Sequence, residues 1–248
     1  MCGRYATTRT APDLAALFEA YDATDAPLAP DYNVAPTDPV PVCRVSASRQ
    51  GRVIEVARWG LVPSWAADRR SGARMINARA ETVATARAFA RSFAGRRCLI
   101  PADGWYEFAV APAGGHGKQP YFMTPRDGSP VVFGGLWTVW GPADDRLLTC
   151  SIVTTAAVGE LAEVHDRMPL LLPPQRWEAW LTAATDLDAL LVAPSSGQVE
   201  ALEIRAVGRA VGDVRNDGPE LIAPLAGAAP LGSTRHAAAP DPVDLTLF

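Results

Sequence analysis

Residues 98 to 110 read CLIPADGWYEFAV, two apolar runs divided by Ala102 and Asp103. Short runs rich in β-branched and aromatic residues and bounded by Gly, Pro or Asp are typical of strands. Cys98 to Pro101 and Gly104 to Val110 are therefore predicted to be strands. The same pattern predicts strands on both sides of this stretch, at Val40 to Val45, Arg52 to Trp59, Tyr121 to Thr124, Val131 to Trp137, Leu147 to Thr154 and Val199 to Val207.

Helical spacing of apolar residues is confined to short segments between these strands. The first has Thr10 as a plausible N-cap and Pro12 in its first turn. Strands and helices do not alternate regularly, so a doubly wound parallel sheet is disfavoured and an α+β fold on antiparallel sheets is predicted. The predicted helices are Pro12 to Tyr21, Asn77 to about Phe93, Ala156 to Val164, Pro174 to Leu181 and Asp186 to Val192.

Length and composition favour one domain followed by a tail. The chain has 248 residues, 48% of them hydrophobic, which is enough for one substantial core. From about Ala226 onward, Ala, Gly and Pro accumulate without periodicity, which predicts disorder. We therefore expect a domain at residues 2–225 and a disordered tail at residues 226–248. No apolar run approaches 18 residues, so no membrane span is predicted.

Charge and cysteine usage narrow the classes of function. A net charge of −4 argues against a protein that coats nucleic acid without regard to sequence, although a local basic groove stays possible. The four cysteines form no C-x-x-C pair and the three histidines are scattered, so neither a metal nor an organic cofactor is implied. Three cysteines lie in strand-like apolar runs and are expected to be reduced, which predicts a cytoplasmic protein.

The N-terminus carries an unusual combination of nucleophiles. If Met1 is removed, Cys2 presents an α-amine and a thiol on one residue, and both can attack the same carbonyl carbon. The reference pKa of an α-amine is near 7.7 to 8.0, so roughly a tenth of it is neutral at pH 7. The free thiol, with a pKa of about 8.5, is only a few per cent thiolate at this pH. Taken alone, Cys2 is equally well explained as incidental.

Several separated motifs occur along the chain: MCGRY (1–5), YNVAP (32–36), WGLVP (59–63), NARAET (77–82), PADGWYE (101–107), GLW (135–137), HDRMP (165–169) and VRNDGP (214–219). In this order and approximate spacing they resemble the SOS-response-associated peptidase (SRAP) family. The resemblance covers roughly residues 2 to 225, and it implies a single α+β domain of curved, largely antiparallel β-sheets, barrel-like, with peripheral helices. It also implies recognition of abasic sites in single-stranded DNA and a covalent crosslink through the N-terminal cysteine, and therefore a nucleoid-associated protein.

The chemistry of an abasic site suits four of these residues. The ring-opened deoxyribose is an aldehyde, to which the amine of Cys2 would add to give an imine, and the thiol would then close a five-membered thiazolidine. Each step moves protons, so a carboxyl and an imidazole are expected nearby. Glu107 and His165 match the two such positions of the family, with the pKa of Glu107 raised beside Trp105. Asn77 is suited to hold the Cys2 amine or the sugar oxygen.

The resemblance also implies residues that bind DNA. Arg4, Arg79 and Arg167 match family positions and are expected to contact the phosphates that flank the lesion, which fixes register without reading sequence. Trp65 is predicted to stack on an unpaired base or to wedge against a duplex end, with core packing as the alternative. Trp59 is predicted to be structural.

The C-terminus adds a possible partner. The last five residues resemble the short motif by which bacterial proteins dock on the DNA polymerase sliding clamp, although that motif usually begins with Gln. Packing of this peptide on its own domain is the alternative. These residues are Asp244, Leu245, Thr246, Leu247 and Phe248.

Three other functions stay open at this point. Glutamine amidotransferases also can begin Met-Cys-Gly, but no synthetase domain follows here and the later motifs differ. A peptidase would use the same thiol and would need a peptide groove. A non-catalytic module that binds single-stranded DNA would explain Trp65 and the arginines, and would make Cys2 incidental.

Overall fold

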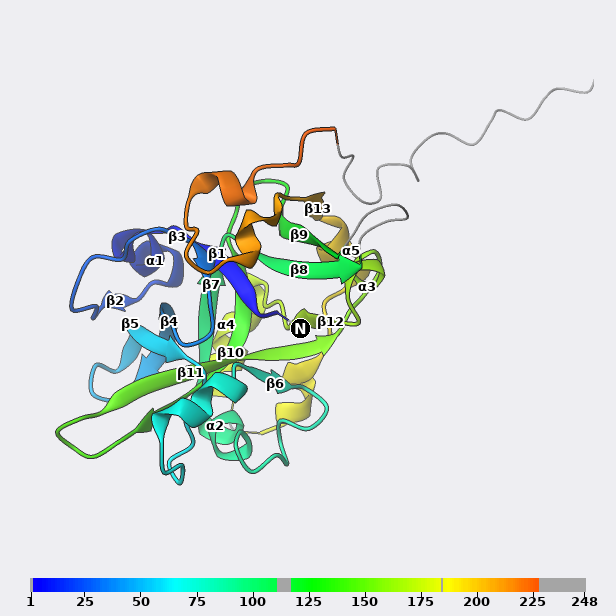
Figure 1. Ribbon diagram of the computed structural model, residues 1–248. Coiled ribbons are helices and arrows are strands. Elements are labelled where there is room, and N and C mark those ends of the chain that lie inside the picture. The colour runs from blue at the N-terminus through cyan, green and yellow to red at the C-terminus, as the bar shows by residue number, and fades with distance from the viewer. Residues whose placement is uncertain (1, 111–116, 184, 228–248) are drawn as a thin grey trace, which may run out of the picture.

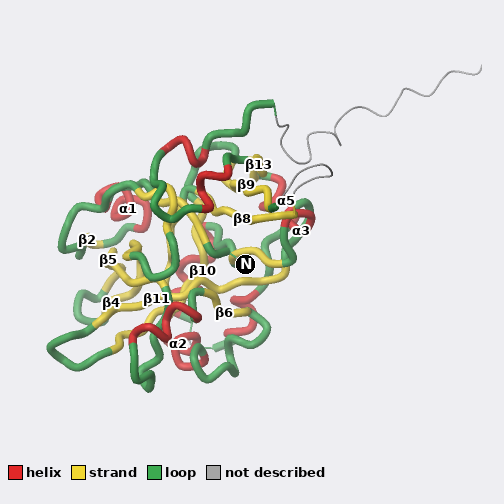
Figure 2. Tube along the Cα trace, viewed as in Figure 1, coloured by secondary structure: helices red, strands yellow, loops and turns green. Residues whose placement is uncertain are grey.

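Two β-sheets with short helices around them form the described part of the protein (Figures 1 and 2). The computed structural model describes residues 2–110, 117–183 and 185–227. Outside these ranges lie Met1, almost all of the predicted tail, and the predicted clamp motif Asp244 to Phe248. Among the described residues, no helix is long and apolar enough to cross a membrane.

The larger sheet closes on itself. Within the described residues, five of its strands form a ring, in which β11 pairs with both β10 and β5. Strands of alternating direction cannot close around an odd number, so one pair has to be parallel, and here it is β5 with β11. The predicted barrel-like sheet is thereby confirmed. In ring order the strands are β5 (Gly51–Trp59), β4 (Pro39–Ser46), β7 (Arg97–Ala102), β10 (Val131–Trp140) and β11 (Leu147–Ala156).

The second sheet is antiparallel throughout and lies above the barrel in Figure 1. The chain passes from β7 of the barrel to β8 of this sheet at Asp103, whose carboxylate accepts hydrogen bonds from the backbone and hydroxyl of Thr8, both at 2.7 Å. Gly104 is required here, because a Cβ would lie 2.3 Å from the Met123 carbonyl oxygen. In order, the strands are β13 (Leu202–Ala206), β9 (Lys118–Pro125), β8 (Gly104–Val110), β1 (Arg4–Thr7) and β3 (Asp31–Val34).

Three short strands extend the barrel sheet. β2 (Tyr21–Asp22) pairs with β5, while β6 (Asn77–Arg79) and β12 (Arg167–Pro169) pair with β11. The prediction of a helix from Asn77 to about Phe93 was therefore wrong over most of its length. The edge of β11 takes the backbone groups of this segment, as in the 2.8 Å bond from Ala80 N to Thr154 O, so tertiary pairing overrides the local pattern.

Helices occupy the outside of the sheets, and the first begins where predicted. Thr10 and Asp13 form a reciprocal capping box at the start of α1, and Leu14 and Phe18 are buried. The predicted strand from Val199 starts later, at Leu202, because α5 precedes it. The helices are α1 (Ala11–Phe18), α2 (Ala90–Gly95), α3 (Leu161–Val164), α4 (Pro174–Thr182) and α5 (Ser196–Glu200), with 3-10 helices η1 (Arg69–Arg74), η2 (Leu187–Leu191), η3 (Arg209–Gly212) and η4 (Pro219–Ile222).

A buried arginine joins two of these helices to the barrel. Arg97 on β7 is 3% exposed, and its guanidinium donates to the carbonyl oxygens of Phe93 and Ala94 in α2. It also donates to Trp180 and Ala183 at the end of α4. Carbonyl oxygens at a helix C-terminus lack intrahelical partners and carry partial negative charge. Arg97 therefore caps both helices at once.

Candidate active site

Strand β1 carries the N-terminal cysteine into the interior. In Figure 1, β1 runs into the space between β8 and β12. Its pairing with β8 sets Arg4 opposite Tyr106, so Glu107, the next residue on β8, stands beside the start of the chain. Cys2 is fully buried. Cys2 and Glu107, which are 105 positions apart in the sequence, are neighbours that interact electrostatically.

Asn77 holds the main chain of Cys2. Its side-chain nitrogen donates to the Cys2 carbonyl oxygen at 2.7 Å. Asn77 is placed by β6, where it pairs with Ile152 of β11. Its side-chain oxygen is buried and has no hydrogen-bond partner among the described residues. Asn77 therefore contacts Cys2 through its main-chain carbonyl, whereas the sequence predicted a bond to the amine or to the sugar oxygen, and its role at the site stays a prediction.

Glu107 is a buried carboxyl with a raised pKa. Only 3% of the residue is exposed, and burial raises the pKa of its carboxyl to about 7. The predicted direction is confirmed. A carboxyl with a pKa near 7 is present in both protonation states at neutral pH, so it can donate and accept protons in successive steps.

The pKa of the Cys2 thiol is raised, whereas the pKa of an activated cysteine nucleophile is lowered. Burial raises its pKa well above the ordinary value, and the nearby Glu107 carboxylate raises it further. The sulfur lies 3.9 Å from the Arg4 carbonyl oxygen, within reach of a weak hydrogen bond. The thiol is therefore neutral at pH 7, which does not suit attack on an unactivated amide.

His165 follows α3, which packs against β8. Its Nδ1 lies 2.9 Å from the backbone N–H of Arg167 and 2.7 Å from a carboxylate oxygen of Asp166. The N–H contact requires an unprotonated Nδ1, whereas the carboxylate contact favours a protonated one. Burial lowers the pKa of His165, so the neutral ring that accepts from Arg167 is favoured at pH 7. Asp166 also raises the pKa of Glu107, which places this turn beside the carboxyl.

The three predicted phosphate-binding arginines differ in how they are engaged. Arg4 donates to Asn33 at 2.7 Å and to the Val211 carbonyl at 2.8 Å, so it ties β1 to β3 and η3. Arg167 forms a two-pronged pair with Glu81, at 2.6 and 3.0 Å. Arg79 is exposed on β6.

Strand β11 brings two of these arginines to its carboxyl end. Arg79 pairs with Thr154 on one side of β11, and Arg167 pairs with Ala156 on the other. Arg167 also donates to the Thr154 carbonyl at 2.7 Å. Two guanidinium groups from distant motifs therefore flank the carboxyl end of a single strand.

The two tryptophans of the Trp59-to-Trp65 segment have different environments. Trp59 is fully buried and donates to the Ile76 carbonyl at 2.9 Å, which confirms a structural role. Trp65 is 52% exposed, so core packing is excluded for it. The Arg87 guanidinium lies 4.5 Å from the centre of the Trp65 ring. Sequence reasoning missed Arg87, because it placed this residue inside a helix that does not form.

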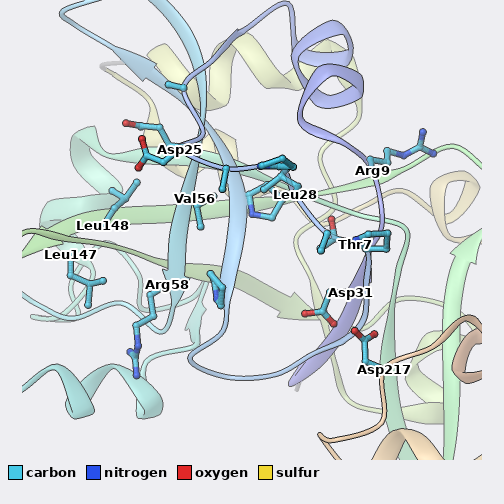
Figure 3. Close-up of a pocket in the computed structure, with 18 of the residues that line it drawn as sticks. Thr7, Arg9, Asp25, Leu28, Asp31, Val56, Arg58, Leu147, Leu148 and Asp217 are labelled. Carbon is cyan, nitrogen blue, oxygen red and sulfur yellow. The ribbon is translucent and has the colours of Figure 1, made fainter.

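A cleft of about 830 Å³ opens elsewhere on the barrel, between β4, β5, the start of β11 and residues 23–31 (Figure 3). None of the predicted catalytic residues lines it. Its lining mixes acids such as Asp25 and Asp31 with Arg58. We therefore place the candidate chemistry at Cys2, where burial and altered pKa values converge, and not in this cleft.

Comparison with known proteins gives one consistent result. The family model described as SOS response associated peptidase (SRAP) matches residues 1–214. The chain is 33% identical over 225 residues to the abasic site processing protein YoqW of Bacillus subtilis (strain 168), covering 90% of this chain and 99% of that protein. It is 34% identical over 231 residues to the abasic site processing protein YedK of Escherichia coli (strain K12), covering 91% and 100%. A crystal structure of a Bacteroides thetaiotaomicron protein shares the fold, with a TM-score of 0.75, 21% identity and coverage of 90% and 100%.

Proposed function

Because the chain belongs to the SOS response associated peptidase (SRAP) family, we propose that it processes abasic sites in single-stranded DNA by crosslinking to them through Cys2. The observation that carries the proposal is the position of Cys2 between Asn77 and Glu107. Asn77 holds the Cys2 carbonyl at 2.7 Å beside a buried carboxyl, Glu107, whose pKa is about 7. Removal of Met1 is required, since an acylated nitrogen cannot form an imine.

The reaction begins at the amine. The Cys2 nitrogen adds to the C1′ aldehyde of the opened sugar, and a proton moves from nitrogen to oxygen to give a carbinolamine. Protonated Glu107 then gives its proton to the hydroxyl, which leaves as water, and the nitrogen returns a proton to the Glu107 carboxylate as the neutral C=N bond forms. His165 assists the earlier opening of the sugar ring.

The thiol acts second. Its sulfur adds to the imine carbon, and its proton passes by way of Glu107 to nitrogen, closing a thiazolidine ring. The raised pKa of the thiol agrees with this order, because a neutral thiol leaves the amine to react first. It disfavours the amidotransferase and peptidase alternatives, in which a thiolate attacks an amide.

DNA would lie along the exposed edge next to Cys2. Arg79 is open to a phosphate, and the exposed face of Trp65 offers a stacking surface for an unpaired base. Arg167 would bind a phosphate only in competition with Glu81, since both of its outer nitrogens contact that carboxylate.

Denaturing gel electrophoresis tests the proposal. The Met1-processed protein incubated with single-stranded DNA that contains an abasic site should give a heat-stable shifted band. Cys2→Ser keeps the amine but lacks the thiol, so its band should require borohydride reduction, whereas the wild-type band should not. A wild-type protein that forms no band, or a Cys2→Ser band of equal stability without reduction, contradicts the thiazolidine. A glutaminase activity lost in Cys2→Ala would instead support the amidotransferase alternative.

A further inference from the structure

Residues 60–76 form an excursion from the barrel, and we call them the 60–76 excursion. Strand β5 pairs in parallel with β11 where Arg58 faces Thr149, and β6 pairs in parallel with the same strand where Asn77 faces Ile152. β6 therefore resumes the line of β5 along β11. The chain leaves this line after β5 and returns to it at β6. The 60–76 excursion between them contains Trp65 and η1.

Two glycines let the 60–76 excursion pack directly on the end of β5. A Cβ at Gly72 would lie 2.3 Å from the Gly60 carbonyl oxygen and 3.1 Å from Nη1 of Arg58. The Arg58 side chain therefore reaches η1, which begins with Arg69. Figure 3 shows the Arg58 side chain pointing away from Asp25.

The charge of Arg58 is only weakly compensated. Its Nη1 is buried and has no hydrogen-bond partner within the described residues. Burial lowers the pKa of Arg58, and the like charge of Arg69 lowers it further. Asp38 acts in the opposite direction, but its carboxylate already accepts the Ala35 N–H at 2.8 Å.

The acid beside Arg69 is also occupied. Asp68 contacts Arg70 through two guanidinium nitrogens, at 2.5 and 2.6 Å, and caps η1 by accepting the Arg70 N–H at 2.8 Å. Arg69 is exposed. The charges of Arg58 and Arg69 interact, and neither guanidinium forms an ion pair with a carboxylate within the described residues, so together they attract an anion. Planar guanidinium forks match phosphate.

We propose that Arg69, supported by the charge of Arg58, binds backbone phosphate of single-stranded DNA at a second point, separate from the crosslinking centre. This rests on the proposed function, because one strand would contact both points. From Thr149, opposite Arg58, to Thr154, opposite Arg79, β11 advances five residues, about 17 Å at ~3.3 Å per residue. Trp65 belongs to the same 60–76 excursion, so the DNA strand would pass Trp65 between the two points. The second point would hold DNA on one side of the lesion only.

Equilibrium binding to a lesion analogue tests this second contact. Each oligonucleotide would carry a tetrahydrofuran abasic analogue, which has no aldehyde and cannot crosslink. One oligonucleotide has short flanks on both sides of the analogue, and the two extended ones add a flank of about ten nucleotides on the 5′ or on the 3′ side. Arg69→Glu should weaken binding about tenfold for one of the two extended oligonucleotides, and lower its salt slope by about 1. Arg70→Glu, the matched control, removes a neighbouring exposed arginine that is already paired with Asp68 and should cost much less.

Two results would overturn the inference. One is an equal loss for the short and both extended oligonucleotides, and the other is an equal loss in Arg69→Glu and Arg70→Glu. Failure of the crosslinking proposal would look different, because it would appear as a missing covalent band with aldehyde-bearing DNA in the wild-type protein. The analogue experiment does not depend on that band.

Discussion

Replacing Glu107 by Gln removes the proposed proton shuttle while keeping the size of the side chain. Glutamine cannot donate a proton to the leaving hydroxyl of the carbinolamine. General acid catalysis contributes about 10²- to 10⁴-fold, so crosslinking at saturating DNA should slow by that factor at pH 6 to 7. Above pH 7, wild-type Glu107 loses its proton and the advantage over Glu107→Gln should shrink.

The same substitution has a stability signature of known sign. The folded carboxyl has a pKa of about 7 and the ordinary value is 4.5, so between these values the folded state binds more protons than the unfolded state. The wild-type free energy of unfolding should therefore fall as the pH rises from 4.5 through about 7. At ~1.36 kcal/mol per pH unit the full loss is ~3 kcal/mol, and Glu107→Gln should not show it.

Two assays check these expectations. Single-turnover crosslinking at saturating DNA measures the rate from pH 5.5 to 8.5, and urea unfolding at pH 5 and pH 8 measures stability. Glu203→Gln is the matched control, because Glu203 lies in the same sheet with 26% of its side chain exposed. The reasoning is refuted if Glu107→Gln keeps the wild-type rate, or if its rate ratio to wild type is independent of pH. It also fails if the wild-type protein and Glu107→Gln lose stability equally between pH 5 and pH 8.

Three further substitutions separate binding, positioning and folding. Trp65→Ala should weaken binding of single-stranded DNA by ~1–3 kcal/mol in a fluorescence anisotropy titration without changing the melting temperature, and equal affinity would exclude stacking. Asn77→Ala should lower the crosslinking rate at saturating DNA more than it lowers affinity for the lesion analogue; an effect on affinity alone would contradict positioning of Cys2. Arg97→Met should cost ~2–4 kcal/mol in urea unfolding, since helix-end carbonyls lose their donor, whereas the neighbouring Arg96→Met should cost ~1 kcal/mol.

Local chemistry was predictable from the sequence. The strands on both sides of Asp103 and the α1 cap at Thr10 follow from neighbouring residues, because side-chain period and capping act within a few positions. Once Met1 is absent, Cys2 carries both an α-amine and a thiol, which follows from its covalent structure alone. Glu107 was named as the carboxyl from its place in the PADGWYE motif.

Other features depend on contacts between distant segments. The parallel β5–β11 pair that closes the barrel joins strands about 90 positions apart. The same strand β11, beyond its pairing with β5, pairs with Asn77 to Arg79 and makes a strand of a segment expected to be helical. Arg4 and Arg167 proved to be bonded to protein groups that no local motif indicates.

The sequence by itself determined which nucleophiles and titratable groups this protein has, and the tertiary structure decided how they ionise. A carboxyl has the same ordinary pKa wherever it occurs in a chain, and that value changes through loss of surrounding water, nearby charges and hydrogen bonds. Glu107 reaches a pKa of about 7 because the folded sheets bury it, and the Cys2 thiol is kept neutral for the same reason. The aromatic neighbours of Glu107 indicated the direction of its shift, but the extent of burial is a property of the packed molecule.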